Sequence, residues 1–179
     1  MANPTEFRSP GLEDQEMQTT KNPEYHEVIN FVWYGNLIDD KYIAAAFDGP
    51  LSFLRATQNN PDTSMVYWCP QPYKSIVQQY LDSLCEEQGL TNKIKVKGIE
   101  DDLLGGLVEK NHIKPHEAEN TRELLNKIAA AKDFNVGKEL VTPLALLLEG
   151  GYFFDTTISV SECLDTDDST LSLPKITKD

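Results

Sequence analysis

Cysteine is scarce in this sequence of 179 residues, which contains three, Cys69, Cys85 and Cys163. Three widely spaced cysteines exclude a disulfide framework and a CxxC metal site, so we expect a reducing compartment. Basic residues are also few, 16 against 29 acidic ones, and the formal net charge is −13. Because scattered and outnumbered basic residues make no surface that grips phosphates, we expect no nucleic-acid partner.

Long apolar runs are missing as well. No stretch approaches the ~20 residues that a transmembrane helix needs, so we expect no membrane span. Residues 1–18 are acidic and lack the apolar segment of a secretory signal, so we expect a cytoplasmic protein or one secreted without a signal peptide. What is present is 40% apolar residues, which suits one ordinary domain with a core.

Polar composition marks both ends of the chain. Residues 1–24 are rich in Pro, Glu, Gln, Thr and Asn, and we expect a flexible arm there. Residues 161–179 are acidic and polar, and we expect a tail of the same kind. The folded domain should then lie at residues 25–160, and no repeat of 20–50 residues divides it.

Within this domain, strand patterns alternate with helix patterns, which predicts an α/β fold with parallel strand pairs. The alternating lysines of residues 93–97 predict an edge strand. Gly105 and Gly106 indicate a plain turn, and Thr142 with Pro143 indicates the start of a helix. The expected strands are residues 28–34, 64–69, 93–97 and 152–158, and the expected helices are residues 39–58, 73–87, 115–133 and 144–149.

The first expected strand ends in a segment that suits a ligand. In a parallel sheet, ligands bind at the carboxyl ends of strands, and residues 31–36, FVWYGN, place Trp33 just before a glycine turn. Trp33 could stack there on a planar base, and Gly35 would let backbone amides approach the ligand. The alternative is that Trp33 packs in the core, as a tryptophan in an apolar run usually does.

The last expected strand carries a carboxylate, in residues 149–157, EGGYFFDTT. Asp155 follows three aromatic residues, and a buried carboxylate is costly unless it is paired, hydrogen-bonded or bound to a metal. At a strand end it could hold Mg²⁺ or Mn²⁺ that bridges two phosphates. The alternative is an aspartate that leaves the strand and caps the next turn through its side chain.

Taken together, these segments resemble the DXD-containing GT-A sugar-nucleotide glycosyltransferases, which include the large clostridial glucosylating toxins and related bacterial effectors. Residues 29–36, INFVWYGN, look like the family's opening strand with its FVWxG motif. Residues 128–134, IAAAKDF, and residues 148–155, LEGGYFFD, are similar to its AAASDxxR and GGxYxDxD motifs. The resemblance covers residues 28–158 and is most specific at its two ends.

The resemblance implies a GT-A-like (Rossmann-like) nucleotide-binding sheet flanked by helices, and an incomplete one because the family's catalytic domains are much longer. It implies a glycosyltransferase that uses a nucleotide sugar, a UDP-sugar, to modify a protein or other acceptor. Trp33 would stack on the base, Asp133 would contact the ribose or sugar, and Asp155 would hold Mn²⁺ or Mg²⁺ at the diphosphate. An effector of this kind would meet a host protein as acceptor or partner, inside a host cell.

Three departures from the family pattern accompany the match. The second DXD acid falls on Thr157, a poor metal ligand, and the family arginine falls on Val136, with Lys138 near enough to stand in. A literal D-x-D occurs at residues 165–167, where we expect solvated acids of the tail. These departures leave an alternative function, a degenerate glycosyltransferase fold that acts as a protein-interaction module.

Overall fold

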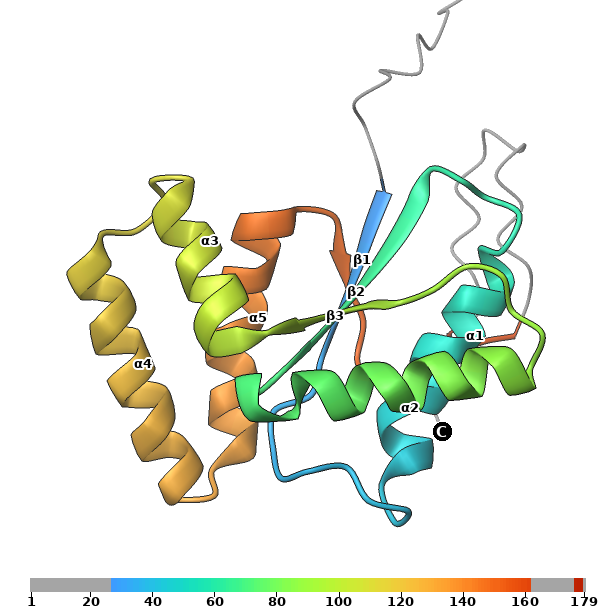
Figure 1. Ribbon diagram of the computed structural model, residues 1–179, viewed down its shortest axis with the longest axis horizontal. Coiled ribbons are helices and arrows are strands. Elements are labelled where there is room, and N and C mark those ends of the chain that lie inside the picture. Colours follow the sequence, from blue (N-terminus) through green and yellow to red (C-terminus); the bar gives the residue numbers. More distant parts are fainter. Residues whose placement is uncertain (1–26, 162–175, 179) are drawn as a thin grey trace, which may run out of the picture.

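Four parallel strands make up the central sheet of the structure, a computed structural model that describes residues 27–161 and 176–178 (Figure 1). The strands lie in the order β3-β2-β1-β4, and each neighbouring pair is parallel. The predicted α/β fold with parallel pairs is therefore confirmed. The arm expected at residues 1–24 and the acids of residues 165–167 lie outside the described residues. The strands are β1 (Glu27–Val32), β2 (Thr63–Cys69), β3 (Lys95–Gly98) and β4 (Tyr152–Phe153).

Helices cover both faces of the sheet, because its inner strands are apolar on both sides. Successive side chains of a strand point to opposite faces, so Phe31 of β1 enters one buried cluster and Val32 enters the other. Strands of this kind are typical of parallel sheets packed between two helical layers. β3 has one neighbour and exposes Lys95, which confirms the predicted edge strand.

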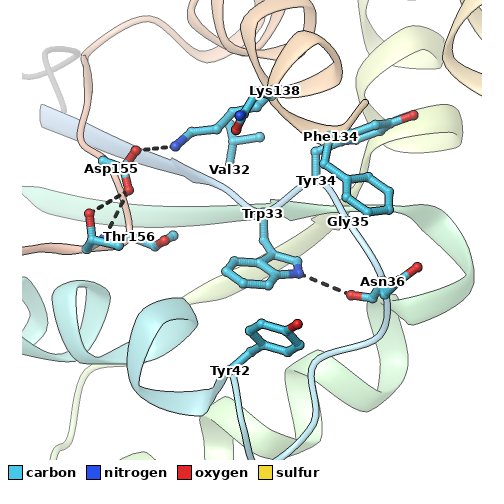
Figure 2. A pocket seen from close by; sticks show the side chains of 12 residues that line it. Val32, Trp33, Tyr34, Gly35, Asn36, Tyr42, Phe134, Lys138, Asp155 and Thr156 are labelled. Atoms are coloured by element: carbon cyan, nitrogen blue, oxygen red, sulfur yellow. Dashed lines mark hydrogen bonds and ion pairs between the residues drawn. The ribbon is translucent and has the colours of Figure 1, made fainter. Parts of the chain in front are cut away.

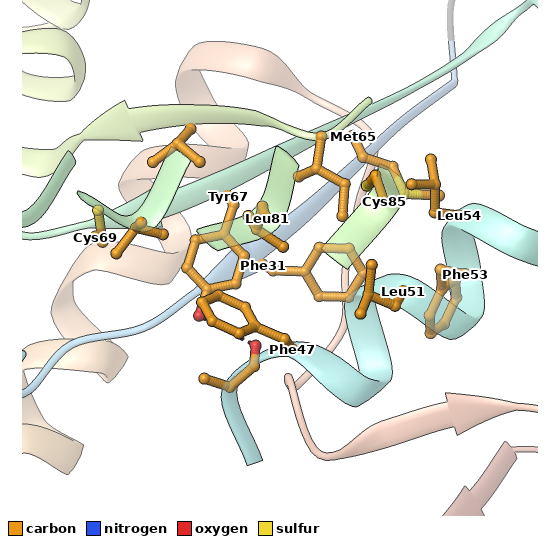
Figure 3. Close-up of a cluster of buried hydrophobic side chains, with 14 of the residues drawn as sticks. Phe31, Phe47, Leu51, Phe53, Leu54, Met65, Tyr67, Cys69, Leu81 and Cys85 are labelled. Atoms are coloured by element: carbon orange, nitrogen blue, oxygen red, sulfur yellow. Dashed lines mark hydrogen bonds between the residues drawn. The ribbon is translucent and has the colours of Figure 1, made fainter. Parts of the chain in front are cut away.

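The first face packs against α1 (Gly49–Ala56) and α2 (Lys74–Glu87). Aromatic rings fill this cluster (Figure 3), where Phe31 meets Phe53 edge to face with 5.5 Å between ring centroids. The π-helical turn η1 (Ala44–Asp48) leads directly into α1. Pro50 stands in the first turn of α1 and cannot donate to the Ala46 carbonyl four residues earlier. The Tyr67 hydroxyl donates to that carbonyl instead, at 3.1 Å.

The second face packs against η3 (Ile99–Leu103), α3 (Leu104–Glu109), α4 (Pro115–Ala130) and α5 (Phe134–Glu149). The turn expected at Gly105 and Gly106 is wrong, because both residues lie inside α3. A Cβ on Gly106 would lie 2.9 Å from Leu148 Cδ2. Gly106 is thus small because α3 and α5 approach each other closely there, and not because the chain turns.

Helix α5 begins at Phe134, ten residues before the helix expected at 144–149. Thr142 is not its cap, because Thr142 Oγ1 donates back to the Lys138 carbonyl at 2.8 Å, a bond typical of threonine inside a helix. Pro143 removes one backbone donor from the helix. The helix continues through it because Val141 and Ala145 are fully buried on its inner face.

β4 is shorter than the strand expected at 152–158, since the chain leaves the sheet after Phe153. Residues Ile158–Val160 form β5, which pairs antiparallel with β6 (Ile176–Lys178) in a second, two-stranded sheet. β6 thus lies within the segment expected as a tail. The turn before β5 rests on α1, where the Gly49 N–H donates to the Thr156 carbonyl at 3.2 Å.

Candidate functional site

The sheet changes direction between β1 and β4. From β1 the chain passes through α1 to β2 on one side, whereas β4 follows α5 and lies on the other side of β1. Because β1 and β4 are parallel, both end at the same edge of the sheet. In open α/β sheets, ligands bind at the carboxyl edge beside such a switch point.

A pocket of about 310 Å³ lies at this position. Three segments form it, namely the chain that follows β1, the first turns of α5 and the chain that follows β4 (Figure 2). Its walls are aromatic on the β1 side and carry one ammonium and one carboxylate on the β4 side. The lining residues are Val32, Trp33, Tyr34, Gly35, Asn36, Tyr42, Phe134, Asn135, Lys138, Asp155, Thr156 and Thr157.

Trp33 is the first residue after β1, and it is half-buried on the pocket wall. Its backbone N–H continues the sheet ladder and donates to the Trp68 carbonyl at 2.8 Å. Its indole Nε1 donates to the Asn36 carbonyl at 3.2 Å, and its ring lies 6.2 Å from that of Tyr42 (Figure 2). Trp33 therefore packs partly on the core and still offers ring surface to the pocket.

Tyr34 and Phe134 make the opposite aromatic wall. Their ring centroids are 6.4 Å apart in an edge-to-face contact, and the Tyr34 hydroxyl donates to the Leu125 carbonyl of α4 at 2.8 Å. Burial, and then the negative charge of Glu100, raises the pKa of Tyr34. Tyr34 is thus a protonated, anchored ring that fixes the start of α5 against the sheet.

Lys138 and Asp155 form an ion pair across the β4 side of the pocket (Figure 2). The side chains are 26% and 36% exposed, so both reach the pocket while their stems are packed. The Lys138 ammonium also lies 5.8 Å from the centre of the Phe153 ring, a distance that suits a cation–π contact. α5 and β4 thereby bring to one place two charges that are 17 positions apart in the chain.

The other oxygen of Asp155 closes a turn. Oδ1 accepts the Thr157 N–H at 3.1 Å and the Thr157 hydroxyl at 3.0 Å. This is the turn-capping geometry expected from the sequence as the alternative to metal binding by Asp155. Partial burial works to raise the pKa of Asp155, but the hydrogen bonds from Lys138 and Thr157 and the charge of Lys138 outweigh it. The net effect lowers the pKa of Asp155, so its carboxylate is ionised at neutral pH.

The described residues fit a divalent cation poorly at this point. Mg²⁺ and Mn²⁺ prefer several oxygen ligands, carboxylates above all. Asp155 instead faces the Lys138 ammonium, and Thr157 stands where a second acid would be needed. Nowhere in residues 27–161 do three or more His, Cys, Asp or Glu side chains gather in a way that could hold a metal ion.

Two of the three site residues expected from the sequence, Trp33 and Asp155, line the pocket together. Asp133 is exposed and precedes α5, next to the lining residue Phe134, without lining the pocket itself. Tyr42 is a lining residue that the sequence reasoning missed, because it lies in a segment that was expected to be helical. Lys138, considered only as a substitute for an arginine, holds the central charge of the site.

Comparison with known proteins finds no family model that matches the chain and no curated protein with significant similarity to it. The likeness to glycosyltransferases therefore rests on the motifs quoted above. In the part of the chain that the structure describes, no helix is both long and apolar enough to cross a membrane.

Proposed function

We propose that the protein is a glycosyltransferase that binds a nucleotide sugar, a UDP-sugar, in the pocket between β1 and β4 of a GT-A-like sheet. One observation carries the proposal. Trp33 and Asp155, which belong to motifs near opposite ends of the domain, line a single pocket at the switch point of the sheet together with Lys138, the partner of Asp155. An aromatic wall suits a base and an ammonium suits a diphosphate, so the pocket has the two features that a nucleotide needs.

The reaction sets a simple demand on such a site. The bond between the anomeric carbon and the diphosphate oxygen breaks, a bond from that carbon to an acceptor oxygen forms, and the acceptor hydroxyl loses its proton. The nucleoside diphosphate leaves with the electron pair. Lys138 can offset the negative charge that develops on this leaving group, and Trp33 can hold the base so that the diphosphate lies beside Lys138.

Calorimetry with UDP, UDP-glucose and UDP-GlcNAc tests binding, with and without Mn²⁺. Because stacking of a base on an aromatic ring contributes about 1–3 kcal/mol, Trp33→Ala should weaken UDP binding by roughly tenfold to a hundredfold. Leu147→Ala is the matched control, since Leu147 is 49% exposed on α5 and lies outside the pocket lining. If none of the three ligands binds at millimolar concentration, with or without Mn²⁺, the proposal is wrong.

A steric variant tests the place of binding. A Cβ on Gly35 would lie 3.7 Å from Trp33 Nε1 and 3.8 Å from Phe134, which are ordinary contact distances. Gly35→Ala should therefore fold and bind normally, whereas the larger side chain of Gly35→Val should fill the space between the two rings and reduce UDP binding. Equal binding by both variants would place the nucleotide elsewhere. A UDP-release assay with candidate acceptors then tests turnover, which binding alone does not establish.

A second candidate function is a protein-interaction module built on a degenerate glycosyltransferase fold. It is favoured by Thr157, which stands in the place of an acid and donates to Asp155 as a structural partner. Under this function, the Lys138–Asp155 pair closes the pocket, and no nucleotide shifts the unfolding temperature. Thermal unfolding at millimolar UDP, UDP-glucose and UDP-GlcNAc distinguishes the two, because a bound ligand stabilises the folded state.

A further inference from the structure

The charge inside the pocket is balanced by two side chains alone. Of the lining residues, Lys138 and Asp155 carry a formal charge, and they are paired with each other. Both oxygens of Asp155 already accept hydrogen bonds, Oδ2 one from Lys138 and Oδ1 two from Thr157, so a cation at this carboxylate would compete with them. Lys138 keeps spare capacity, since an ammonium has three N–H donors and this one is given a single carboxylate oxygen.

The ammonium and a divalent cation exclude one another at this carboxylate. A metal ion bound by Asp155 would have to displace Lys138 or sit beside it, and two cations within about 4 Å repel each other strongly in a half-buried site. Lys138 is held in place from two sides, by Asp155 and by the ring of Phe153. Its backbone lies in the second turn of α5, whose amino-terminal end adds positive potential toward the pocket.

We propose that Lys138, and not a divalent cation, neutralises the diphosphate of the nucleotide, so that the protein binds its nucleotide without metal. This inference rests on the proposed function and deepens it. In the protein without nucleotide, the Lys138 ammonium is paired with Asp155. When a nucleotide binds, the free N–H donors of Lys138 reach the phosphate oxygens, and Asp155 holds the ammonium at the pocket wall.

The wild-type protein supplies the first test, by calorimetry with UDP and with uridine in EDTA and then in Mn²⁺. We expect UDP to bind in EDTA within about twofold of its affinity in Mn²⁺, and to bind more tightly than uridine. If UDP binds in Mn²⁺ and not in EDTA, the inference is overturned and the proposed function stands. If neither UDP nor uridine binds in either buffer, the proposed function fails, and this inference fails with it.

Variants of the pair supply the second test. Lys138→Met should weaken UDP binding by about tenfold to a hundredfold, the effect of losing a charge-assisted hydrogen bond, while uridine binding stays the same. Lys97→Met is the matched control, because Lys97 forms a comparable half-buried ion pair with Glu149 outside this pocket. A Lys138→Met protein that still binds UDP as tightly as the wild type overturns the inference.

Asp155→Asn distinguishes most sharply between neutralisation of the diphosphate by Lys138 and neutralisation by a divalent cation. It releases Lys138 from its partner and removes a negative charge beside the diphosphate, so UDP should bind in EDTA at least as tightly as to the wild type. In Mn²⁺, a carboxylate that held a metal would give the opposite result, loss of the UDP binding that the wild type shows there, and that result would overturn the inference. Should Lys138→Met fold poorly because it leaves Asp155 unpaired, the double variant Lys138→Met/Asp155→Asn removes both charges together, and it should bind UDP more weakly than the Asp155→Asn single variant does.

Discussion

Trp68 and Asn30 are joined by a hydrogen bond in the middle of the sheet, where the Trp68 indole Nε1 donates to Asn30 Oδ1 at 3.1 Å. Both side chains are fully buried. The amide of Asn30 in turn donates to the carbonyls of Gly150 and Tyr152, at 2.9 Å and 3.2 Å. One polar side chain therefore connects β2 through β1 to the turn that enters β4, and so fixes the strand that Asp155 follows.

Asn30→Leu should destabilise the protein by about 2–4 kcal/mol, because it removes three side-chain hydrogen bonds and leaves the buried Trp68 indole N–H without its acceptor. Urea unfolding measures this change in the free energy of unfolding. Asn92→Leu is the control, since Asn92 donates one hydrogen bond, to the Gln58 carbonyl, from a half-buried loop position. Its cost should stay near 1 kcal/mol, and equal costs for the two variants would contradict this account.

Two glycines inside helices should respond to alanine in opposite directions. A Cβ on Gly137 of α5 would overlap with the Tyr34 ring, whereas a Cβ on Gly105 of α3 would meet nothing within 4 Å. Alanine is the better helix former by about 1 kcal/mol. Gly105→Ala should therefore stabilise the protein by up to about 1 kcal/mol, and Gly137→Ala should destabilise it by about 1–3 kcal/mol through overpacking. Thermal or urea unfolding of both variants checks the difference in sign.

The ion pair of Asp155 should make stability depend on acid pH. The pKa of Asp155 is lowered in the folded protein, so the pair contributes stability above the pKa of an unfolded aspartate, about 3.9. That contribution is lost as the pH falls through the lower, folded pKa. The free energies of unfolding of the wild type and Asp155→Asn should thus differ at pH 7 and converge at lower pH.

Asp102→Asn provides a parallel case outside the pocket. Burial works to raise the pKa of Asp102, but hydrogen bonds from Lys74 and the Gly98 N–H and the charges of Lys74 and Lys97 outweigh it and lower that pKa. The loss of stability caused by Asp102→Asn should therefore also shrink as the pH falls. A gap between wild type and Asp155→Asn that widens in acid would contradict the assignment of the pair.

The buried thiols should be unreactive in the folded protein. Burial first, and then the charges of Glu100 and Asp102 against that of Lys74, raises the pKa of Cys69 to about 12. Burial and the charge of Asp82 also raise the pKa of Cys85. Because the thiolate is the reactive form, Cys69 should react with iodoacetamide at pH 8 about a thousandfold more slowly in the native than in the unfolded protein.

Mass spectrometry of the Cys163→Ser variant measures the two remaining thiols separately. Unfolding in urea should restore fast labelling of both cysteines. Suppose that Cys69 of the native protein is labelled as fast as Cys69 of the unfolded protein. The buried cluster against α1 and α2, to which Cys69 belongs, then opens to solvent far more often than its packing indicates.

The sequence predicted the layers of the fold better than the helix ends. Strands β1 to β3 follow from their apolar runs, and each was expected within a few residues of its place. The start of α5 was missed because Gly137 and Pro143 weaken its helical pattern. The reason for Gly137 is its contact with Tyr34, a residue about a hundred positions earlier that no local pattern connects to it.

The candidate site was predictable as two halves and not as a whole. Trp33 and Asp155 each follow an expected strand, and a parallel sheet carries such residues to one edge. Lys138 was less accessible to sequence reasoning, because its position opposite Asp155 depends on the register of α5 against β4. The exposure of Trp33 depends likewise on where β1 ends, since Trp68, in an equally apolar run, is fully buried.

The place of β4 in the sheet also determines when the pocket can exist. Its pairing with β1 joins residues about 120 positions apart, whereas β1, β2 and β3 pair in the order in which they are synthesised. Closing the longest loop comes at the greatest entropic cost, so the pairing of β4 should be the last step in forming the sheet. Trp33 therefore meets Lys138 and Asp155 only when α5 and β4 dock, and a ligand of the pocket could stabilise the fold only through this last step.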